Sequence, residues 1–303
     1  MNRAILKSKF LRIPFIISLV FLSACYVHVR YESNDQKNIR KGVEEVFAKM
    51  GTINFSDFSE NFDDDVKKRF ERIKEYISNN KFEVSSRTNY LNKIIFENKI
   101  VKKGNTVVDL GSGWGFECLL LRQVIVGDKG KVIGVDIDET SNIVARKYGE
   151  HLGFDNVDFI FGDIREVPLA DNIADVVISN YTLTLILKED KEKVFSEIYR
   201  ILKDGGSCYI GDAIIYGKNY DLLDKINNNT LYDYYYMSRS IREKEYLAIL
   251  KRIGFKNIKI KIYAYTGISD YDTGRLFTVR RLLDRFYYRD KIVAADVYIY
   301  AEK

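Results

Sequence analysis

Short apolar segments alternate with amphipathic segments over the middle of the chain. Apolar and β-branched runs predict strands at Thr106 to Leu110, Lys131 to Asp136, Val157 to Gly162, Val176 to Ser179 and Ser207 to Gly211. Apolar residues at helical spacing predict helices from Phe116, over Thr140 to Leu152 and over Lys188 to Leu202, before a turn at Asp204 to Gly206. This alternation is typical of a parallel sheet covered by helices on both faces. The pattern therefore predicts an α/β, doubly wound domain.

Both flanks of this pattern extend the predicted domain. Asn257 to Tyr265 and Ala294 to Ala301 alternate with polar residues, and we expect them to complete a mostly parallel seven-stranded sheet as an antiparallel pair. Helical spacing from Asn61 to Ile77, and again at about Arg87 to Asn98, predicts a helical N-terminal extension. Asp63 to Asp65 suit the amino terminus of the first helix better than a metal site.

The amino terminus has the layout of an export signal. Basic residues end at Arg12, an apolar run spans Ile13 to Leu22, and small residues precede Cys25. Leu22 to Cys25 resembles the lipobox of bacterial lipoproteins, in which the cysteine thiol is acylated. An uncleaved membrane anchor over Ile13 to Val29 is the alternative. We expect a signal or anchor at 1–25, a polar tether at 26–60 and a catalytic domain at 61–303, with its core at 88–260.

Charge and cysteine content exclude some classes of protein. The chain has 48 basic and 43 acidic residues, but four of the bases lie in the leader, so the body is nearly neutral and lacks the basic excess expected of a nucleic-acid-binding protein. Three cysteines and two histidines are too few and too scattered for a zinc site. We therefore expect no nucleic-acid partner and no metal.

A glycine motif carries the main chemical signal. The sequence Asp109, Leu110, Gly111, Ser112, Gly113, Trp114, Gly115 follows a predicted strand and opens a predicted helix. Glycines let backbone approach a ligand, and helix N–H groups favour a carboxylate or phosphate. The third glycine comes one residue earlier than in a pyrophosphate-binding loop, and the preceding acid would repel a phosphate and attract an ammonium. The motif therefore indicates a ligand with both an amino group and a carboxylate.

This motif resembles motif I of class I S-adenosylmethionine-dependent methyltransferases, and the similarity runs over about residues 88–260. The resemblance implies a Rossmann-like fold and S-adenosylmethionine as co-substrate. It places Asp109 near the methionine ammonium and Asp136, which ends the next strand, on the ribose, with Asp138 as a solvated turn residue. The cofactor-binding residues that it implies are Asp109, Gly111, Ser112, Gly113, Gly115, Asp136, Asp163, Ile164 and Asn180. The interpretation of Asp163 as a turn-capping residue stays open.

Within the family, the motifs are most similar to those of arsenite methyltransferases and quinone C-methyltransferases. Cys118 matches a metalloid-binding cysteine of the arsenite enzymes, but Tyr181 replaces a second one. A lone thiol cannot make the multidentate site that trivalent arsenic requires, so we expect Cys118 to be a packed helix residue. Trp114 suits packing on the glycine loop and substrate contact equally well.

Two segments near the predicted site are rich in aromatic residues. The cluster Tyr232 to Met237 suits an apolar or cation-attracting pocket, or a packed or membrane-facing helix. The insert Ile268 to Asp290 suits a second lid or a packed extension. No residue can be named as a catalytic base, because methyl transfer from a sulfonium mainly needs alignment and exclusion of water.

We expect an enzyme that transfers a methyl group to a small or lipidic acceptor. The alternative is a membrane-anchored lipoprotein that keeps the fold as a binding or structural module without catalysis; aminopropyl transfer is weaker, because no paired acids suit a polyamine. We expect membrane association through Cys25, with a cytoplasmic location if the leader is uncleaved or the true start lies downstream.

Overall fold

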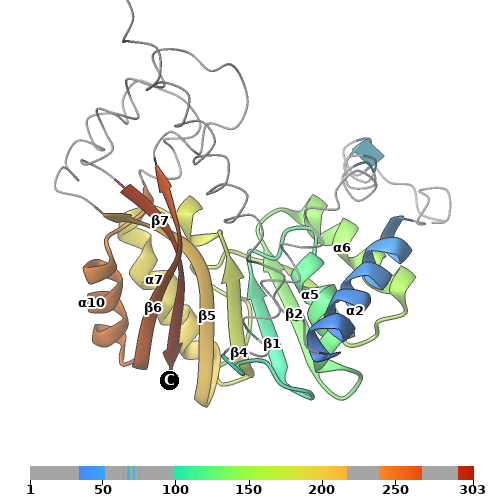
Figure 1. Cartoon of the computed structure of the whole chain (residues 1–303), viewed down its shortest axis with the longest axis horizontal. Coiled ribbons are helices and arrows are strands. Elements are labelled where there is room, and N and C mark those ends of the chain that lie inside the picture. Colours follow the sequence, from blue (N-terminus) through green and yellow to red (C-terminus); the bar gives the residue numbers. More distant parts are fainter. Residues whose placement is uncertain are drawn as a thin grey trace, which may run out of the picture. The chain divides into compact units, whose positions relative to one another are not determined.

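A computed structural model describes residues 34–51, 64, 67, 68, 71, 75, 94, 98–216, 239–267 and 293–303 (Figure 1). The chain divides into two compact units, Met1–Asn38 and Ile39–Lys303. Of the first unit only Asn34–Asn38 are described, and they begin the helix α2 (Asn34–Gly51). All the features below belong to the second unit.

The second unit contains one seven-stranded sheet, with strand order β3-β2-β1-β4-β5-β7-β6. Strands β1 to β5 pair in parallel, and β7 pairs antiparallel with both β5 and β6. Their bounds are β1 Thr106–Leu110, β2 Lys131–Asp136, β3 Val157–Phe161, β4 Ala174–Asn180, β5 Leu202–Tyr216, β6 Lys256–Gly267 and β7 Val293–Glu302. The doubly wound, mostly parallel, seven-stranded sheet with an antiparallel final pair is confirmed.

Helices cover both faces of this sheet (Figure 1). Val107 of β1 packs in one apolar cluster with residues of α2, α5 (Phe116–Leu121) and α6 (Glu139–Leu152). The next residue along β1, Val108, packs in a second cluster with α7 (Lys191–Ile201) and α10 (Glu243–Ile253). Successive side chains of a strand point to opposite faces, so a continuously apolar strand supplies both clusters.

Some boundaries differ from the sequence-based expectations. The helix after β1 ends at Leu121 and continues as a π-helix over Arg122–Val126. A 3-10 turn, Lys188–Asp190, precedes α7. The predicted turn at Asp204 to Gly206 is a bulge within β5: the pairing with β4 jumps from Leu202 to Ser207, and Gly205 has a φ of 76°. Glycine makes this left-handed conformation accessible.

The predicted tether over residues 26–60 is in part a packed helix, which corrects that expectation. In α2, Val46 and Met50 are 1% and 0% exposed and belong to the core. Residues four apart lie on one face of a helix, so Val46 and Met50 pack on the core together although most of the stretch is polar. The rest of that stretch, and the leader with Cys25, lie outside the described residues. Within the part of the chain that the structure describes, no helix is long and apolar enough to cross a membrane.

The predicted helix from Asn61 to Ile77 is described at five positions only. Asp64, Lys67, Lys68, Glu71 and Glu75 are helical and exposed, as expected for the polar face of an amphipathic helix. The second predicted helix at about Arg87 to Asn98 falls almost entirely outside the described residues, as do the cluster Tyr232 to Met237 and the insert Ile268 to Asp290.

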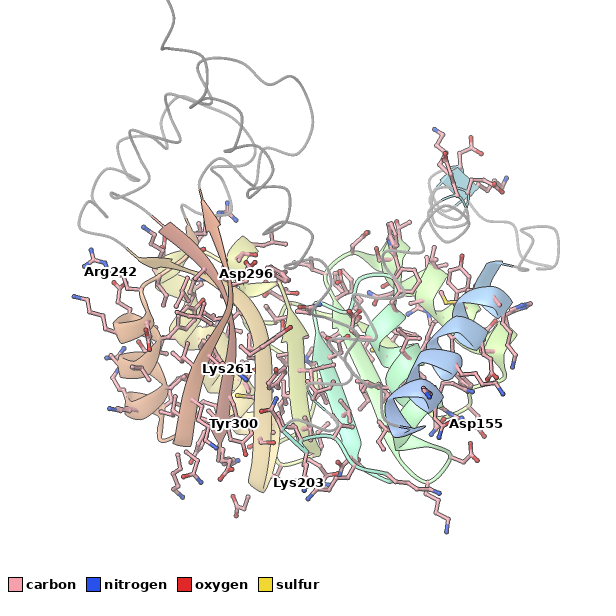
Figure 2. All side chains as sticks on the ribbon, viewed as in Figure 1. Asp155, Lys203, Arg242, Lys261, Asp296 and Tyr300 are labelled. Atoms are coloured by element: carbon pink, nitrogen blue, oxygen red, sulfur yellow. The ribbon has the colours of Figure 1, made fainter. Side chains whose placement is uncertain are left out.

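The strands β1 and β4 lie side by side at the centre of the sheet and end at the same edge. Ser179 ties these ends together, because its Oγ donates to the Leu110 carbonyl at 2.7 Å. Figure 2 shows Asp296 of β7 near this carboxyl edge and Lys203 of β5 at the opposite edge. In a doubly wound sheet, ligands bind outside the carboxyl ends of the strands. The fold therefore places the glycine motif where a ligand is expected.

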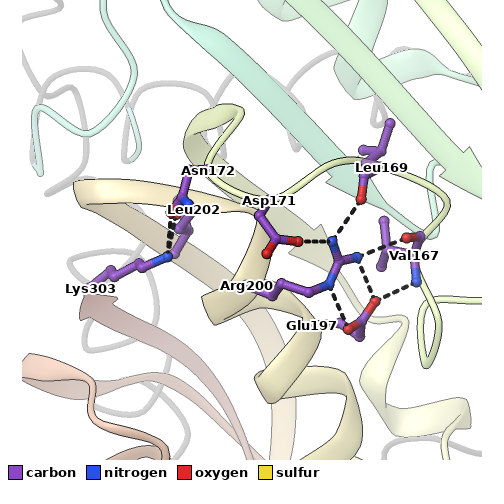
Figure 3. Close-up of polar contacts among 8 residues, drawn as sticks. All are labelled: Val167, Leu169, Asp171, Asn172, Glu197, Arg200, Leu202 and Lys303. Carbon is purple, nitrogen blue, oxygen red and sulfur yellow. Dashed lines mark hydrogen bonds and ion pairs between the residues drawn. The ribbon is translucent and has the colours of Figure 1, made fainter.

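An ionic cluster fixes α7 to the connection between β3 and β4 (Figure 3). Arg200 donates to the carbonyls of Leu169 and Val167 at 2.7 and 2.9 Å and pairs with Asp171 and Glu197. The Glu197 carboxylate also accepts the Val167 N–H at 2.7 Å. The cluster supplies hydrogen-bond partners for the backbone N–H of Val167 and the carbonyls of Val167 and Leu169, which lie between two strands. It therefore stabilises the connection.

Candidate active site

The glycine loop between β1 and α5 is bound to the end of β2. The N–H groups of Gly111 and Ser112 donate to the Val135 carbonyl at 2.8 and 3.2 Å, and that of Gly113 donates to Asp136 Oδ2 at 2.8 Å. These amides therefore hold the loop itself, and the expectation of a ligand carboxylate at the N–H groups of the following helix stays a prediction.

The three glycines of the motif have left-handed φ values but different surroundings. At Gly111, φ 77°, a Cβ would lie 2.1 Å from Thr182 Oγ1, so the glycine lets the turn after β4 approach. At Gly115, φ 78°, a Cβ would lie 2.5 Å from the Phe159 ring, so this glycine allows packing against β3 and α6. At Gly113, φ 52°, a Cβ would meet no atom within 4 Å. Only Gly113 leaves open space at the loop.

A cavity of about 210 Å³ lies beside this loop. Its described lining residues are Asp109, Gly111, Ser112, Gly113, Trp114, Phe116, Glu117 and Asn180. The volume is below the roughly 300 Å³ at which ligand pockets usually begin, so it suits one end of a nucleoside-sized ligand. Of the predicted cofactor residues, Gly115, Asp136, Asp163 and Ile164 do not line it.

Two buried carboxylates face this cavity. Asp109 at the end of β1 is 2% exposed, and Glu117 in the first turn of α5 is 7% exposed. The Asn180 amide at the end of β4 donates to Glu117 Oε1 at 3.4 Å. None of the described lining residues is basic. The cavity is therefore suited to a positively charged group.

Sequence reasoning missed Glu117. Its signal was available, since it lies two residues after Gly115 and so falls in the first turn of the predicted helix. An acid there is usually interpreted as dipole-favouring surface charge. The structure buries this one instead.

Asp136 ends β2, half-buried, and both of its oxygens bind backbone. Oδ2 accepts the Gly113 N–H and Oδ1 accepts the Asp138 N–H, each at 2.8 Å. Its predicted contact with a ribose stays a prediction. Asp138 caps α6, accepting from the Thr140 N–H at 3.2 Å and the Ser141 hydroxyl at 2.7 Å, so it is a structural residue rather than merely a solvated one.

The residues after β3 are engaged in local contacts. Asp163 accepts the Arg165 backbone N–H at 2.8 Å and the Arg165 guanidinium at 2.7 Å, and these hydrogen bonds hold the pKa of the Asp163 carboxyl below its ordinary value. Ile164 is 6% exposed and packs in the core. The geometry supports the turn-forming interpretation of Asp163, and its predicted contact near adenine stays a prediction.

Cys118 is a packed helix residue. It is fully buried, and its Sγ donates to Asp109 Oδ2 at 3.5 Å. Burial and the neighbouring Asp109 carboxylate raise the pKa of the thiol well above its ordinary value, so it stays protonated. Within the described residues, no group of three or more His, Cys, Asp or Glu side chains could hold a metal ion.

Trp114 both packs and lines the cavity. Its ring makes an edge-to-face contact with Phe116 at 6.1 Å between centroids, and it packs against the core cluster that contains α5. It also belongs to the cavity lining, so the two interpretations of this residue coexist.

The residues present fit the co-substrate that the motif implies. S-adenosylmethionine carries an ammonium and a sulfonium, both positive, and Asp109 and Glu117 are the buried carboxylates that would hold this end. Charge-assisted hydrogen bonds to such groups contribute roughly 1.5–3 kcal/mol each. Gly113 leaves room for the ligand to approach the loop.

Comparison with known families agrees with this geometry. Residues 101–254, half of the chain, match the family model described as a methyltransferase domain. Residues 32–167 also match the model of protein-L-isoaspartate(D-aspartate) O-methyltransferases.

Individual relatives and structures give the same result. An arsenite methyltransferase of Halobacterium salinarum is 42% identical over 111 residues, 37% of this chain but only 28% of the relative. The ubiquinone/menaquinone biosynthesis C-methyltransferase of Haemophilus ducreyi is 30% identical over 177 residues, 52% of this chain and 67% of the relative. A phosphoethanolamine N-methyltransferase of Haemonchus contortus in complex with S-adenosylmethionine superposes with a TM-score of 0.53 and 20% identity over 71% of this chain and 52% of that chain, which shows the shared fold. The chain belongs to the class I S-adenosylmethionine-dependent methyltransferases, and S-adenosylmethionine is the methyl donor of this family.

Proposed function

We propose that this protein transfers the methyl group of S-adenosylmethionine to a small or lipidic acceptor. The observation that carries this proposal is the cavity beside the glycine loop, in which two buried carboxylates stand next to the open position at Gly113. Such a lining favours an ammonium and a sulfonium and disfavours the phosphates of a dinucleotide.

The protein's own residues contribute binding and alignment. The bound co-substrate supplies an electrophilic methyl group on its sulfonium. Asp109 and Glu117 orient the charged amino-acid end, and Asn180 at the end of β4 lines the same cavity and holds Glu117. Alignment of this kind lowers the activation barrier of methyl transfer, because the reactants lose their translational and rotational freedom on binding, before the chemical step. No dedicated base is required.

Exposed apolar side chains support a lipidic acceptor. The large hydrophobic residues exposed in the described part of the chain are Ile137, Phe161, Tyr181, Leu185 and Leu187. All five lie at or just after the carboxyl ends of β2, β3 and β4. Exposed apolar side chains at this edge of the sheet suit an apolar acceptor better than an ionic one. The similarity to the quinone-pathway C-methyltransferase points the same way.

Trivalent arsenic is not supported as the acceptor, although arsenite methyltransferases are among the relatives. Its coordination needs several thiolates. Of the thiols that the structure describes, Cys118 is protonated against Asp109, and Cys208 is fully buried in β5 with its pKa raised to about 12, chiefly by burial.

Donor binding is the first test. Calorimetric titration of the protein with S-adenosylmethionine should show saturable binding, and D109N should weaken it at least tenfold. D155N is the matched control, because Asp155 is an exposed aspartate in the loop after α6 (Figure 2). If the wild-type protein shows no saturable heat of binding, the proposed methyltransferase function is excluded.

Acceptor class is the second test. The protein is incubated with methyl-tritiated S-adenosylmethionine and either a total lipid extract or a water-soluble metabolite pool. Label that enters the organic phase supports a lipidic acceptor. Saturable binding without transfer to either pool would instead support the alternative function, a lipoprotein that binds S-adenosylmethionine without catalysis.

We also propose that the protein is tethered to a membrane through acylated Cys25. Leu22 to Cys25 and the preceding apolar run support this. Mass spectrometry of the mature amino terminus should find a lipid-modified Cys25, and C25S should release the protein from the membrane fraction. An intact Met1 on protein recovered from the soluble fraction would contradict the proposal.

A further inference from the structure

Three fully buried polar side chains lie outside the cavity and have no place in donor binding. Lys191 begins α7, Asp212 lies in β5, and Tyr246 lies in α10; each is 0% exposed. Charged groups are strongly disfavoured away from water unless they are compensated, so both charges require partners. Asp212 pairs in the sheet with Val297, the neighbour of Asp296 at the carboxyl edge (Figure 2).

Lys191 binds a backbone carbonyl, and Asp212 and Tyr246 lie close to its side chain. The Lys191 ammonium donates to the Leu183 carbonyl. Burial lowers the pKa of Lys191 and raises the pKa of the Asp212 carboxyl, and the attraction between the two groups opposes both effects. Asp212 Oδ2 accepts the Tyr246 hydroxyl, whereas Asp212 Oδ1 has no hydrogen-bond partner among the described residues. Lys191 is thus the group that holds the backbone, and Asp212 and Tyr246 are its buried neighbours.

The Leu183 carbonyl lies in the turn that follows β4. Tyr181 has a φ of 56°, a conformation that a large L-residue rarely adopts. Its N–H donates to the Gly211 carbonyl, next to Asp212, at 2.8 Å, and its carbonyl accepts from the Thr184 hydroxyl at 2.8 Å. Strained backbone of this kind persists only where the surroundings fix it, and it concentrates at functional sites.

The turn contacts the site on both sides. Asn180, which precedes it, lines the cavity and donates to Glu117. Thr182 packs on the glycine loop, where its Oγ1 lies 3.4 Å from the Gly111 carbonyl oxygen. A shift of the turn would therefore move both the loop and the end of β4 that lines the cavity.

We propose that Lys191 and Asp212 are positioning residues of one clamp: Lys191 holds the Leu183 carbonyl, Asp212 is its buried counter-group in β5, and together they hold the strained Tyr181 turn against the glycine loop. The clamp itself rests on contacts within the chain. Its meaning for catalysis rests on the proposed function. Tyr246 supports the clamp through its hydroxyl on Asp212 and its ring 5.9 Å from the Lys191 ammonium.

Hydrogen exchange tests the clamp without any ligand. In K191M and D212N, the amides of 181–186 should exchange at least tenfold faster than in the wild-type protein, while those of β1 stay unchanged. The matched control is E192Q, which removes an ion pair between α7 and α10, Glu192 to Arg252, that does not touch the turn. Unchanged exchange of 181–186 in both variants would overturn the clamp and leave the proposed function standing.

Donor binding tests the positioning role. The chain's single tryptophan, Trp114, lines the cavity, so its fluorescence reports the binding of S-adenosylhomocysteine. The double variant K191M/D212N removes both buried charges and should regain the melting temperature lost by each single variant, yet bind the probe about tenfold more weakly than wild type. Wild-type affinity in a double variant with a loosened turn would overturn the positioning role. Absence of binding by the wild-type protein would instead count against the proposed function.

Discussion

At the scale of single residues, the site is defined by which acids are buried. Asp109 and Glu117 are enclosed beside the glycine loop, whereas Asp138 caps a helix and Asp163 is paired with Arg165. The sequence motifs single out Asp109 and Asp163 as candidates and leave Glu117 out. Burial beside a cavity separates the two that suit a cationic ligand from the two that stabilise local turns.

Replacing Glu117 by glutamine should weaken S-adenosylmethionine binding about tenfold, which corresponds to roughly 1.4 kcal/mol. The substitution keeps the hydrogen bond with Asn180 but removes a negative charge from the lining of the cavity in which we propose that the donor's positive groups bind. Isothermal titration measures the effect. E150Q, on the exposed end of α6, is the control, and equal affinities for E117Q and E150Q would show that Glu117 does not contact the donor.

At the scale of elements, glycine conformation links the loop to the packing of its neighbours. Gly113, Gly115 and Gly153 all have left-handed φ values, between 52° and 78°. Of these three glycines, only Gly115 has other side chains where a Cβ would lie. An added Cβ would be 2.5 Å from the Phe159 ring and 2.9 Å from the Ala145 methyl. The same substitution therefore has different consequences at the three positions.

G115A should lower the free energy of unfolding by about 2–4 kcal/mol, because overpacking adds to left-handed strain. G153A, at the end of α6 with nothing within 4 Å, carries the strain alone and should lose only about 1 kcal/mol. G113A should match G153A in stability but lose donor affinity. Urea unfolding and calorimetry measure both quantities. A G115A protein as stable as G153A would contradict the packing role.

At the scale of the whole molecule, the carboxylate of Glu197, which joins α7 to the connection between β3 and β4, makes stability depend on pH. Glu197 accepts two hydrogen bonds from Arg200 and one from Val167, and the Arg200 contact holds the pKa of the Glu197 carboxyl below its ordinary value of 4.5. A lowered pKa in the folded state means that the contribution to stability is fully present above pH 4.5. It is lost as the pH falls through the lowered value.

E197Q should therefore be less stable than the wild-type protein by about 1–2 kcal/mol at pH 7. The difference should shrink as the pH falls below 4.5, because the wild-type carboxylate becomes protonated. Urea unfolding at several pH values measures it. E192Q serves as the control, since its ion pair with Arg252 is exposed and such pairs contribute little. A pH-independent difference would contradict the carboxylate's role.

The sequence predicted the central architecture well because local chemistry determined it. Thr106–Leu110 and Lys131–Asp136 form strands with the predicted bounds, since each is an apolar run that follows a polar, glycine-containing turn. The family resemblance located the glycine loop, and the loop borders the cavity as expected.

Long-range features could not be predicted in this way. In sequence, Lys191 and Asp212 are two ordinary charges 21 residues apart, and they come close to each other and to the turn after β4 only once β4, β5 and α7 are packed. Glu117 resembles a surface acid until the turn of the helix buries it. The extension of β5 through Gly205 depends on its pairing with β4, which no local pattern encodes.

Asp136 gives this site a built-in competition. Each carboxylate oxygen already accepts one main-chain N–H, from Gly113 or from Asp138, and each keeps a further lone pair. A nucleoside sugar bound there would have to share the carboxylate with the loop. Removing the carboxylate would then relax the empty loop and weaken the filled site together, so a variant at Asp136 reports the balance between them.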